Sequence, residues 1–441
     1  MRSSQSTVFQ GLVLVIAMLM CLGVPVSANQ ATLQVYLRQA NVQEYEWEKQ
    51  VLAIFEEENP DTAIEIVTEA GSDYSNKLIA LWAAGDAPDV WDHGGPVRDY
   101  VEKGWLLDLT PFVERDKSEI GINEFFPGAW AAYRTGGKQW GMPFMSVPSF
   151  MWVNVEQFHQ AGVEAPPVSW DDQSWNWDRV RESAKKITRK STEDIFLTVG
   201  LGVIHWSYLD IAYSWLGGGD WFDNQAYERG IPNRSTFATP ENERAYQIPI
   251  DMVHKDGCAA ESYSFEVVNR FMHGDVAMVM GEGPWLVMGN TQDIKFPWAM
   301  APNPWGQTQA SMIYTDPWMI SSQTKHPEEA WQLVKYLTSR EVMESYMAFA
   351  VFPPARRSVL SGYLNTLATA SEHHTAAQIL EALAGAQKYG RETPEHVIAS
   401  WLDYDNVIAN RLPQAWSNEK AVMTVLLEID EALAGIVKKN N

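Results

Sequence analysis

The sequence predicts an α/β protein whose chain is divided between two domains. Strand-like and helix-like segments alternate regularly in the N-terminal part, which is typical of a largely parallel sheet covered by helices. In addition, a chain of 441 residues exceeds what a single hydrophobic core usually supports. In open sheets of this kind, ligands bind beyond the carboxyl ends of the strands.

The first elements have the clearest periodicity. A helix is predicted over residues 42–58, because its apolar residues recur at helical spacing and Asn59 and Pro60 end it. These apolar residues are Trp47, Val51, Ile54 and Phe55. The neighbouring predicted elements are a strand at 32–37, a strand at 63–67 and a helix at 74–84. Gly85 provides a C-terminal cap for the second helix.

The remaining elements are predicted from the same patterns. Further strands are expected at 89–91, 144–154, 197–204, 276–280, 294–302 and 313–321. Further helices are expected after Ser169 as N-cap, up to Trp215, over 244–254, over 328–348 and through most of the C-terminal part. Pro249 predicts a kink in the helix at 244–254.

Residues 1–28 are typical of a secretory signal peptide. Arg2 precedes an apolar run at 11–23, and Val26, Ser27 and Ala28 form a small-residue cleavage site. The apolar run is too short for a comfortable membrane span, and no second long apolar segment follows it. We therefore expect an exported protein. Cys21 leaves lipidation open, although Met20 before it is larger than the residue that lipoprotein processing requires.

Composition narrows the classes of partner. A formal net charge of −23 disfavours nucleic acid and anionic lipid surfaces, and it weighs mildly against an anionic ligand. Cys258 is the one cysteine beyond the signal, so no internal disulfide is expected, and we expect a packed thiol. Most of the 20 Trp must lie in the core. We expect a few to stack on sugar rings, since aromatic faces pack against apolar C–H faces.

The segment from Phe271 to Trp285 is the most informative motif. A helix end runs into the predicted strand at 276–280, and a Gly-Glu-Gly-Pro turn then presents Trp285. The glycines permit backbone angles closed to other residues, and Pro284 stiffens the exit. An indole held on such a turn is a platform for a flat apolar face. The alternative is a strand–turn–helix junction with a tryptophan in the core.

Other motifs occur in a recognisable order. They lie at 83–90, 103–111, 137–143, 166–172, 313–321 and 352–356. Together with the motif ending at Trp285, they resemble the extracellular solute-binding proteins of bacterial ABC importers, the sugar-binding family that includes maltose-binding protein. Val153 stands where the family usually has tyrosine, and Thr315 to Pro317 replace its usual glycine pair. The second departure places an acid and an aromatic residue near the expected pocket.

The resemblance implies a class II periplasmic-binding-protein fold, with two α/β lobes joined by a hinge and a ligand cleft between them. It implies a first lobe of 29–145 and 287–350, and a second lobe of 146–286 and 351–441. It further implies a binding protein without catalysis, cofactor or metal, whose lobes close on a carbohydrate. The expected partners are the carbohydrate and the transmembrane subunits of an ABC importer, with the protein itself a monomer.

The resemblance and the turn chemistry together suggest the ligand-binding residues. The expected stacking residues are Trp206, Tyr208, Trp285 and Trp318. The expected hydrogen-bonding residues are Asp92, His93, Glu282 and Asp316. Trp91, just before Asp92, and Trp401, in the C-terminal part, are further candidates to line the cleft.

Two other functions remain open from the residues alone. A secreted glycoside hydrolase would also be acidic and rich in tryptophan, and it would need a pair of carboxylates. A non-sugar solute is the other alternative: a polyamine would suit the acids, whereas glycerol phosphate would require basic residues that the motif turns lack. No nucleophile elbow, phosphate-binding loop or helical zinc motif is present. His373 and His374 are expected to be a surface pair rather than a metal site.

Overall fold

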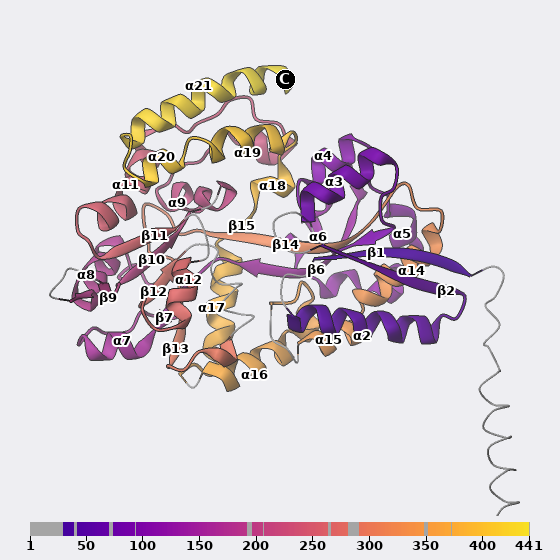
Figure 1. The fold of residues 1–441 in the computed structure, drawn as a ribbon, viewed down its shortest axis with the longest axis horizontal. Helices are drawn as coiled ribbons and strands as arrows, with labels where there is room; N and C mark the ends of the chain where they lie inside the picture. Colours follow the sequence, from indigo (N-terminus) through magenta and orange to yellow (C-terminus); the bar gives the residue numbers. More distant parts are fainter. Residues whose placement is uncertain are drawn as a thin grey trace, which may run out of the picture.

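The structure is a computed structural model of the chain. It describes residues 30–38, 42–69, 74–92, 94–191, 196–205, 207–262, 266–280, 291–347, 352–371 and 373–440. The predicted signal at 1–28 lies outside these residues. Two sheets, each covered by helices, form two lobes that lie side by side (Figure 1). The predicted fold class, a two-lobed α/β protein, is confirmed.

The first lobe is built on a six-stranded sheet with the order β15-β14-β3-β1-β2, in which β6 also pairs with β14. Its strands are β1 (Ala31–Arg38), β2 (Thr62–Glu69), β3 (Val90–Trp91), β6 (Gly141–Pro148), β14 (Ser311–Ile320) and β15 (Gly390–Glu392). β1 is parallel to β2 and β3, whereas β14 is antiparallel to β3 and β6. The predicted alternation of strands and helices therefore produces the parallel part of a mixed sheet.

Helices cover both faces of this sheet. They are α2 (Val42–Glu58), α3 (Tyr74–Ala84), α4 (Val97–Glu102), α5 (Thr110–Ile120), α6 (Pro127–Ala132), α14 (Pro327–Leu337) and α15 (Arg340–Tyr346). α2 and α3 lie on opposite faces (Figure 1). Between α6 and β6 the chain forms a small hairpin of β4 (Arg134–Thr135) and β5 (Lys138–Gln139).

The predicted bounds of α2 and α3 are confirmed, and Gly85 has the left-handed φ of 78° expected of a C-terminal cap. One detail of the prediction for α2, its set of buried apolar residues, is wrong. Ile54 is 46% exposed, and Leu52 is buried in its place. With 3.6 residues per turn, the buried arc centres on Val51 and Phe55, and Ile54 falls just beyond its edge.

The second lobe is built on a five-stranded sheet with the order β11-β10-β12-β7-β13. Its strands are β7 (Met151–Asn154), β10 (Leu201–Ile204), β11 (Ala259–Ser262), β12 (Met278–Met280) and β13 (Trp298–Ala301). β10 is parallel to β11 and β12, and β7 is antiparallel to β12 and β13. The single strand predicted at 144–154 is thus two strands, β6 and β7, one in each sheet.

The helices of the second lobe lie mainly in the middle and at the end of the chain. They are α7 (Val155–Gln160), α8 (Trp177–Ile187), α9 (Ile211–Leu216), α10 (Gln225–Arg229), α11 (Pro240–His254), α12 (Glu266–Met272), α19 (Trp401–Ala409), α20 (Pro413–Trp416) and α21 (Val422–Asn440). A short hairpin joins β8 (Arg189–Lys190) to β9 (Phe196–Thr198). The predicted N-cap at Ser169 is wrong, because α8 begins later and the Asn176 side chain accepts the N–H of Arg179.

Two long strands connect the lobes. β6 and β14 pair antiparallel from Gly141 to Pro148 and run between the two lobes (Figure 1). Between the lobes lie α16 (Leu360–Ser371) and α17 (Ala376–Lys388), which precede β15, and α18 (Pro394–Val397), which follows it. α17 contacts strands of both sheets. The sheets place β13 with the second lobe and β15 with the first, which differs from the predicted boundaries at 287 and 351; those boundaries stay a prediction.

Several side chains behave differently from their predicted roles. His374 is buried, not a surface residue, and burial lowers its pKa to about 4. Cys258 is a buried free thiol, as expected. Trp170, Trp175 and Trp177 are packing residues, as predicted. Within the described ranges, no helix combines the length and the apolar character that crossing a membrane requires.

Candidate functional site between the lobes

The candidate site begins at the edge of the first sheet that faces the second lobe. β1 runs toward the second lobe, and α2 begins at that end of the strand (Figure 1). Arg38 is the last residue of β1, and Asp92 directly follows β3, which is parallel to β1. Parallel neighbouring strands end at the same edge of a sheet, so the two residues lie together. Asp316 on β14 joins them, with its Oδ2 3.6 Å from Arg38 Nη2.

Asp92 is held from two sides. Its Oδ2 accepts the backbone N–H of Arg38 at 3.4 Å, and its Oδ1 accepts the hydroxyl of Tyr74 at 2.9 Å. Tyr74 is the first residue of α3 and is itself stacked on Tyr36 of β1, with ring centroids 4.5 Å apart. The carboxylate position is therefore fixed by the strand and by the helix that follows it.

The first turns of α2 add two more carboxyl groups. Glu44 is 3% exposed and Glu48 is 2% exposed, which is rare for acids. The hydroxyl of Tyr346 donates to Glu44 Oε1 at 3.2 Å. The carboxyl group of Glu48 shares a hydrogen bond with Asp92, while Glu48 Oε2 has no hydrogen-bond partner.

Burial controls the protonation of these two acids. It raises the pKa of Glu44 to about 8, against the opposing effect of Arg38. Burial also raises the pKa of Glu48 well above its usual range, and the charges of Asp92 and Glu44 add to the rise. Near neutral pH, Glu44 therefore holds a proton in this arrangement. Although burial opposes it, Asp316 and Asp92 raise the pKa of the Arg38 guanidinium.

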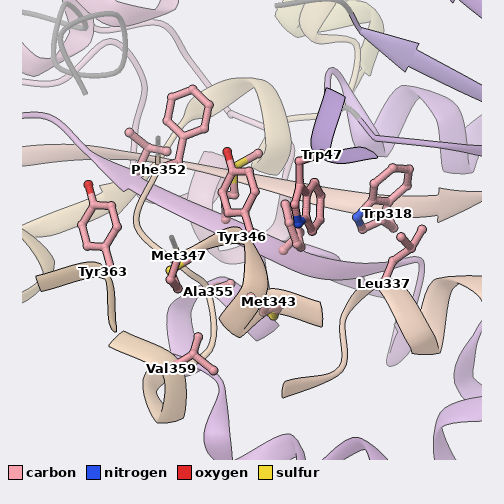
Figure 2. Close-up of a cluster of buried hydrophobic side chains, with 14 of the residues drawn as sticks. Trp47, Trp318, Leu337, Met343, Tyr346, Met347, Phe352, Ala355, Val359 and Tyr363 are labelled. Carbon is pink, nitrogen blue, oxygen red and sulfur yellow. The ribbon is translucent and has the colours of Figure 1, made fainter. Parts of the chain in front are cut away.

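Aromatic residues pack behind the acids. Trp47 of α2 meets Tyr346 edge-on at 4.8 Å between ring centroids, and it stacks on Phe144 at 5.6 Å. Trp318 of β14 meets Phe144 edge-on at 6.2 Å. Figure 2 shows Trp47, Trp318 and Tyr346 in one apolar cluster with residues of α15 and the segment after it. This packing fixes the helix that carries Glu44 and Glu48 against the sheet.

Residues of the C-terminal part of the chain add further polar side chains next to those of β1, α2 and β14, on the side of the second lobe. Burial raises the pKa of Glu395 in α18 to about 7, against the effect of His396, and Tyr314 of β14 shares a hydrogen bond with the carboxyl group. Gly94, in the loop after β3, approaches this region closely. A Cβ there would lie 2.6 Å from both His396 Nε2 and Tyr133 Oη, so a larger residue would force these buried side chains to shift.

Arg391 of β15 links the first sheet to the second lobe. Its guanidinium lies 4.3 Å from the Trp215 ring and 4.6 Å from the Tyr227 ring. The same group is 2.8 Å from Asp220, which also accepts from Trp215 and Tyr227. One strand of the first sheet is thereby fixed to α9 and α10.

A second interlobe contact joins α4 to α19. Asp99 of α4 accepts the backbone N–H of Leu402 at 3.4 Å, in the first turn of α19. The backbone N–H groups of Ser400 and Trp401 also face this carboxylate. Free N–H groups at a helix start favour a carboxylate, so Asp99 acts as a cap supplied by the other lobe.

The parallel strands of the second sheet provide the opposite edge. His205 follows β10, is almost fully buried, and has its Nε2 2.6 Å from Glu261 of β11. Its ring stacks on Trp416 at 5.0 Å. The hydrogen bond to His205 lowers the pKa of Glu261.

The structure places the predicted site residues in three groups. Asp92 and Asp316 come together through Arg38. Trp91, Trp318 and Trp401 are buried at 0%, 1% and 0% exposure in the cores of the lobes. His93, Trp206, Glu282 and Trp285 lie outside the described residues, and of Tyr208 only the backbone, in a 3₁₀ turn, is described. Binding by each of these residues stays a prediction.

Sequence reasoning missed Arg38, Glu44, Glu48, Tyr74 and Tyr346. A signal for the first three was present, because Arg38 ends a predicted strand and the acids occupy the apolar face of the following helix. Charged residues at helical spacing among Trp47 and Val51 are a mark of buried polar groups. Tyr346 gave no such signal, since only the tertiary fold brings it to Glu44.

Other parts of the described chain provide weaker candidates for a ligand site or a metal site. No group of three or more His, Cys, Asp or Glu within the described ranges is arranged to hold a metal ion. A hollow of about 390 Å³ is lined by residues that include Phe55, Glu119 and Arg340, all of the first lobe. A ligand held between two lobes does not fit a hollow on one of them.

Comparison with known proteins assigns the family. The sequence model for "Bacterial extracellular solute-binding protein" matches residues 33–344, which is most of the chain. The chain belongs to the bacterial extracellular solute-binding proteins. This family works outside the cytoplasm, in agreement with the predicted export.

Relatives of this solute-binding protein match between two thirds and nine tenths of its length. A putative binding protein of Brucella abortus is 22% identical over 405 residues, which cover 89% of this chain and 90% of the relative. The arabinooligosaccharide-binding protein of Halalkalibacterium halodurans is 26% identical over 320 residues, covering 69% of this chain and 67% of that protein.

Solved structures show the same fold. An ABC substrate-binding protein of Listeria monocytogenes in complex with cycloalternan has a TM-score of 0.77 and 21% identity, with 92% of this chain and 99% of that chain covered. A solute-binding protein of Thermotoga lettingae bound to α-D-tagatose has a TM-score of 0.76 and 20% identity, covering 92% and 100%. The two-lobed architecture is therefore common to these solute-binding proteins.

Proposed function

We propose that this solute-binding protein is the receptor of an ABC importer and binds a carbohydrate between its lobes. The observation that carries the proposal is the polar edge formed by Arg38, Asp92 and Asp316, which faces the second lobe within a fold whose relatives include sugar-binding proteins. Carboxylates and a guanidinium at such an edge can bind sugar hydroxyl groups from both directions.

Binding works by closure of the two lobes on the sugar. β6 and β14 serve as the hinge strands, and a ligand that contacts both lobes stabilises the closed form. Asp92, His93, Glu282 and Asp316 are the proposed hydrogen-bonding residues. Trp206, Tyr208, Trp285 and Trp318 are the proposed stacking residues, with Trp91 and Trp401 also proposed to line the site. The proposed lobes are 29–145 with 287–350, and 146–286 with 351–441.

The protein binds its sugar without cleaving it. The carboxyl groups at the proposed site serve as hydrogen-bonding groups, and Glu44 and Glu48 are held by helix packing rather than facing each other across a bond. The closed monomer then delivers the sugar by docking on the transmembrane subunits of the importer. No cofactor or metal takes part in this function.

Thermal melting of the purified protein against mono- and oligosaccharides tests the proposal, with sugar phosphates and polyamines as controls. A ligand that binds only the folded state raises the melting temperature. We expect one class of sugar to do so and to be recovered intact by chromatography. Small-angle scattering with that sugar should show a smaller radius of gyration, as closure requires. A response to sugar phosphates alone would refute the carbohydrate assignment, and release of sugar products would establish hydrolysis.

A further inference from the structure

Three acidic side chains lie where α4 of the first lobe meets α18 and α19, and we call them the junction acids: Asp99, Glu395 and Asp405. α4 and α19 belong to opposite lobes, and α18 lies between them and contacts α4 (Figure 1). Asp99 accepts the backbone N–H of Leu402 at the start of α19. The charge of Asp405 on α19 acts on Glu395 of α18. Acids from both sides of the junction are therefore brought together at one interlobe contact.

Each junction acid has one carboxyl oxygen that is enclosed. Asp99 Oδ1, Glu395 Oε2 and Asp405 Oδ1 are shielded from solvent and have no hydrogen-bond partner among the described residues. Burying a carboxylate is costly unless hydrogen bonds and opposite charge compensate it. A protonated carboxyl group carries no net charge and avoids most of this cost. The geometry therefore disfavours the ionised acids while α4 contacts α18 and α19.

Titratable groups from both lobes surround Glu395. Two of them favour its ionised form, namely Tyr314, which shares a hydrogen bond with it, and His396, whose Nδ1 is 2.8 Å from Glu392. The other groups are acids and phenols, which cannot carry a positive charge: Asp316 of β14, Tyr100 of α4, Tyr133 at the end of α6 and Asp405 of α19. Burial is the main reason that the pKa of Glu395 rises to about 7.

The other two junction acids respond to burial in the same direction. Burial raises the pKa of Asp405 to about 6. It also raises the pKa of Asp99, although the N–H groups at the start of α19 and the charge of Lys103 oppose the rise. The phenol of Tyr404 on α19 is the further titratable group near Asp99. When the lobes separate, these carboxyl groups regain water, and their pKa values return toward about 4.

We propose that the pH of the medium regulates closure of the lobes, because the junction acids take up protons when α4 closes onto α18 and α19. The inference rests on the hinged closure proposed above, but not on the identity of the solute. The closed form binds more protons than the open form, so rising pH opposes closure. The contribution of Glu395 is fully present below about pH 4.5 and is lost as the pH rises through about 7. A receptor outside the cytoplasm meets the pH of its surroundings and would hold its solute more tightly in an acidic medium.

The direct test is small-angle scattering of the purified protein, eluted from a sizing column, across a series of pH values. No solute is needed, because the radius of gyration reports how far the lobes are separated. From about pH 5.5 to about pH 8, the ratio of closed to open protein should fall by at least about tenfold, since each proton is worth up to tenfold per pH unit. The radius of gyration should therefore increase with pH. A constant radius of gyration across this range would overturn the inference.

Matched variants locate the effect. Glu395→Gln places a neutral group of the same shape at the junction, so this variant should stay compact at high pH and lose most of the pH dependence. Asp403→Asn is the control, because Asp403 is an exposed acid in the first turn of α19, and it should keep the wild-type profile. Asp405→Asn should lose a smaller part of the dependence, and it decides the matter if circular dichroism shows that Glu395→Gln is unfolded. The wild-type profile in both Glu395→Gln and Asp405→Asn would contradict the assignment to the junction acids.

Thermal melting with the mono- and oligosaccharides at both ends of the pH range separates this inference from the proposed function. A radius of gyration that changes with pH, in a protein that no sugar stabilises, would support proton-linked closure and refute the carbohydrate receptor. A sugar that binds while the radius of gyration is the same at both pH values would support the receptor and overturn the inference. Binding that is tighter at the lower pH, together with a smaller radius of gyration there, would support both.

Discussion

Replacing Glu44 by Gln should change how the stability of the protein depends on pH. Glu44 is 3% exposed, and burial raises its pKa from 4.5 to about 8 in the folded state. The folded state therefore holds a proton on Glu44 that the unfolded chain has already released. Between these two values, stability falls as the pH rises, because the folded state binds more protons than the unfolded state does.

The size of the effect follows from the two pKa values. One pH unit is worth about 1.36 kcal/mol for one proton, so the interval from 4.5 to about 8 corresponds to at most about 5 kcal/mol. Below about pH 4.5 this contribution of Glu44 is fully present, and above about pH 8 it is lost. The groups that face Glu44 are Arg38, Asp92, Asp316 and the Tyr346 hydroxyl. The carboxamide that Glu44→Gln introduces does not titrate. The free energy of unfolding of the variant therefore lacks the part of its pH dependence that Glu44 contributes.

Urea unfolding at several pH values, followed by circular dichroism, measures the free energy of unfolding for both proteins. The difference between wild type and Glu44→Gln should fall with rising pH across this interval, by a slope that approaches one proton. Glu46→Gln, with an exposed carboxyl group on the same helix, should keep the wild-type slope. Identical slopes for wild type and Glu44→Gln would refute the buried, protonated state of Glu44.

Three further predictions address packing, the link between the lobes and the ligand. Gly94→Ala should lower the free energy of unfolding by about 1–3 kcal/mol, because its Cβ would lie 2.6 Å from His396 and Tyr133, and thermal melting should show the loss. Gly128→Ala is its control: a Cβ there meets nothing within 4 Å, so a lowered melting temperature for this variant as well would disprove the steric argument. Arg391→Ala should cost about 1–2 kcal/mol by removing the guanidinium from Asp220, Trp215 and Tyr227. Chemical denaturation tests this loss, and Arg391→Lys should restore only part of it, so full rescue by lysine would exclude the planar stacking role. Trp285→Ala should weaken binding of the identified ligand by a few kcal/mol, as for buried aromatic contacts at hot spots. Unchanged affinity in calorimetry would remove Trp285 from the site.

The local elements of the first lobe were well predicted from the sequence. Residues 42–58 and 74–84 have strong helical periodicity with clear stops at Asn59, Pro60 and Gly85, and the structure has the same bounds. Prediction was poorer where one apolar run serves two sheets. Nothing local distinguishes the end of β6 from the start of β7, because both are fully buried. The break arises from the crossing between the lobes.

The candidate site was predictable only in part. Asp92 and Asp316 were identified from their place in family motifs, but their partner Arg38 was not. His374 was predicted to lie on the surface because it forms a polar pair with His373. The structure instead buries His374 beside Met300. Burial is a property of long-range packing, and a short window of sequence does not contain it.

By itself, the sequence determined the two-lobed α/β class, the acidic character and the membership of a solute-binding family, because periodicity, composition and ordered motifs are local properties of the chain. The tertiary structure alone decided which charges meet. Glu44 and Tyr346 are far apart in sequence and form a hydrogen bond of 3.2 Å. Their burial around Arg38 sets the protonation of the acids, since pKa values depend on neighbours and solvent exclusion rather than on residue type.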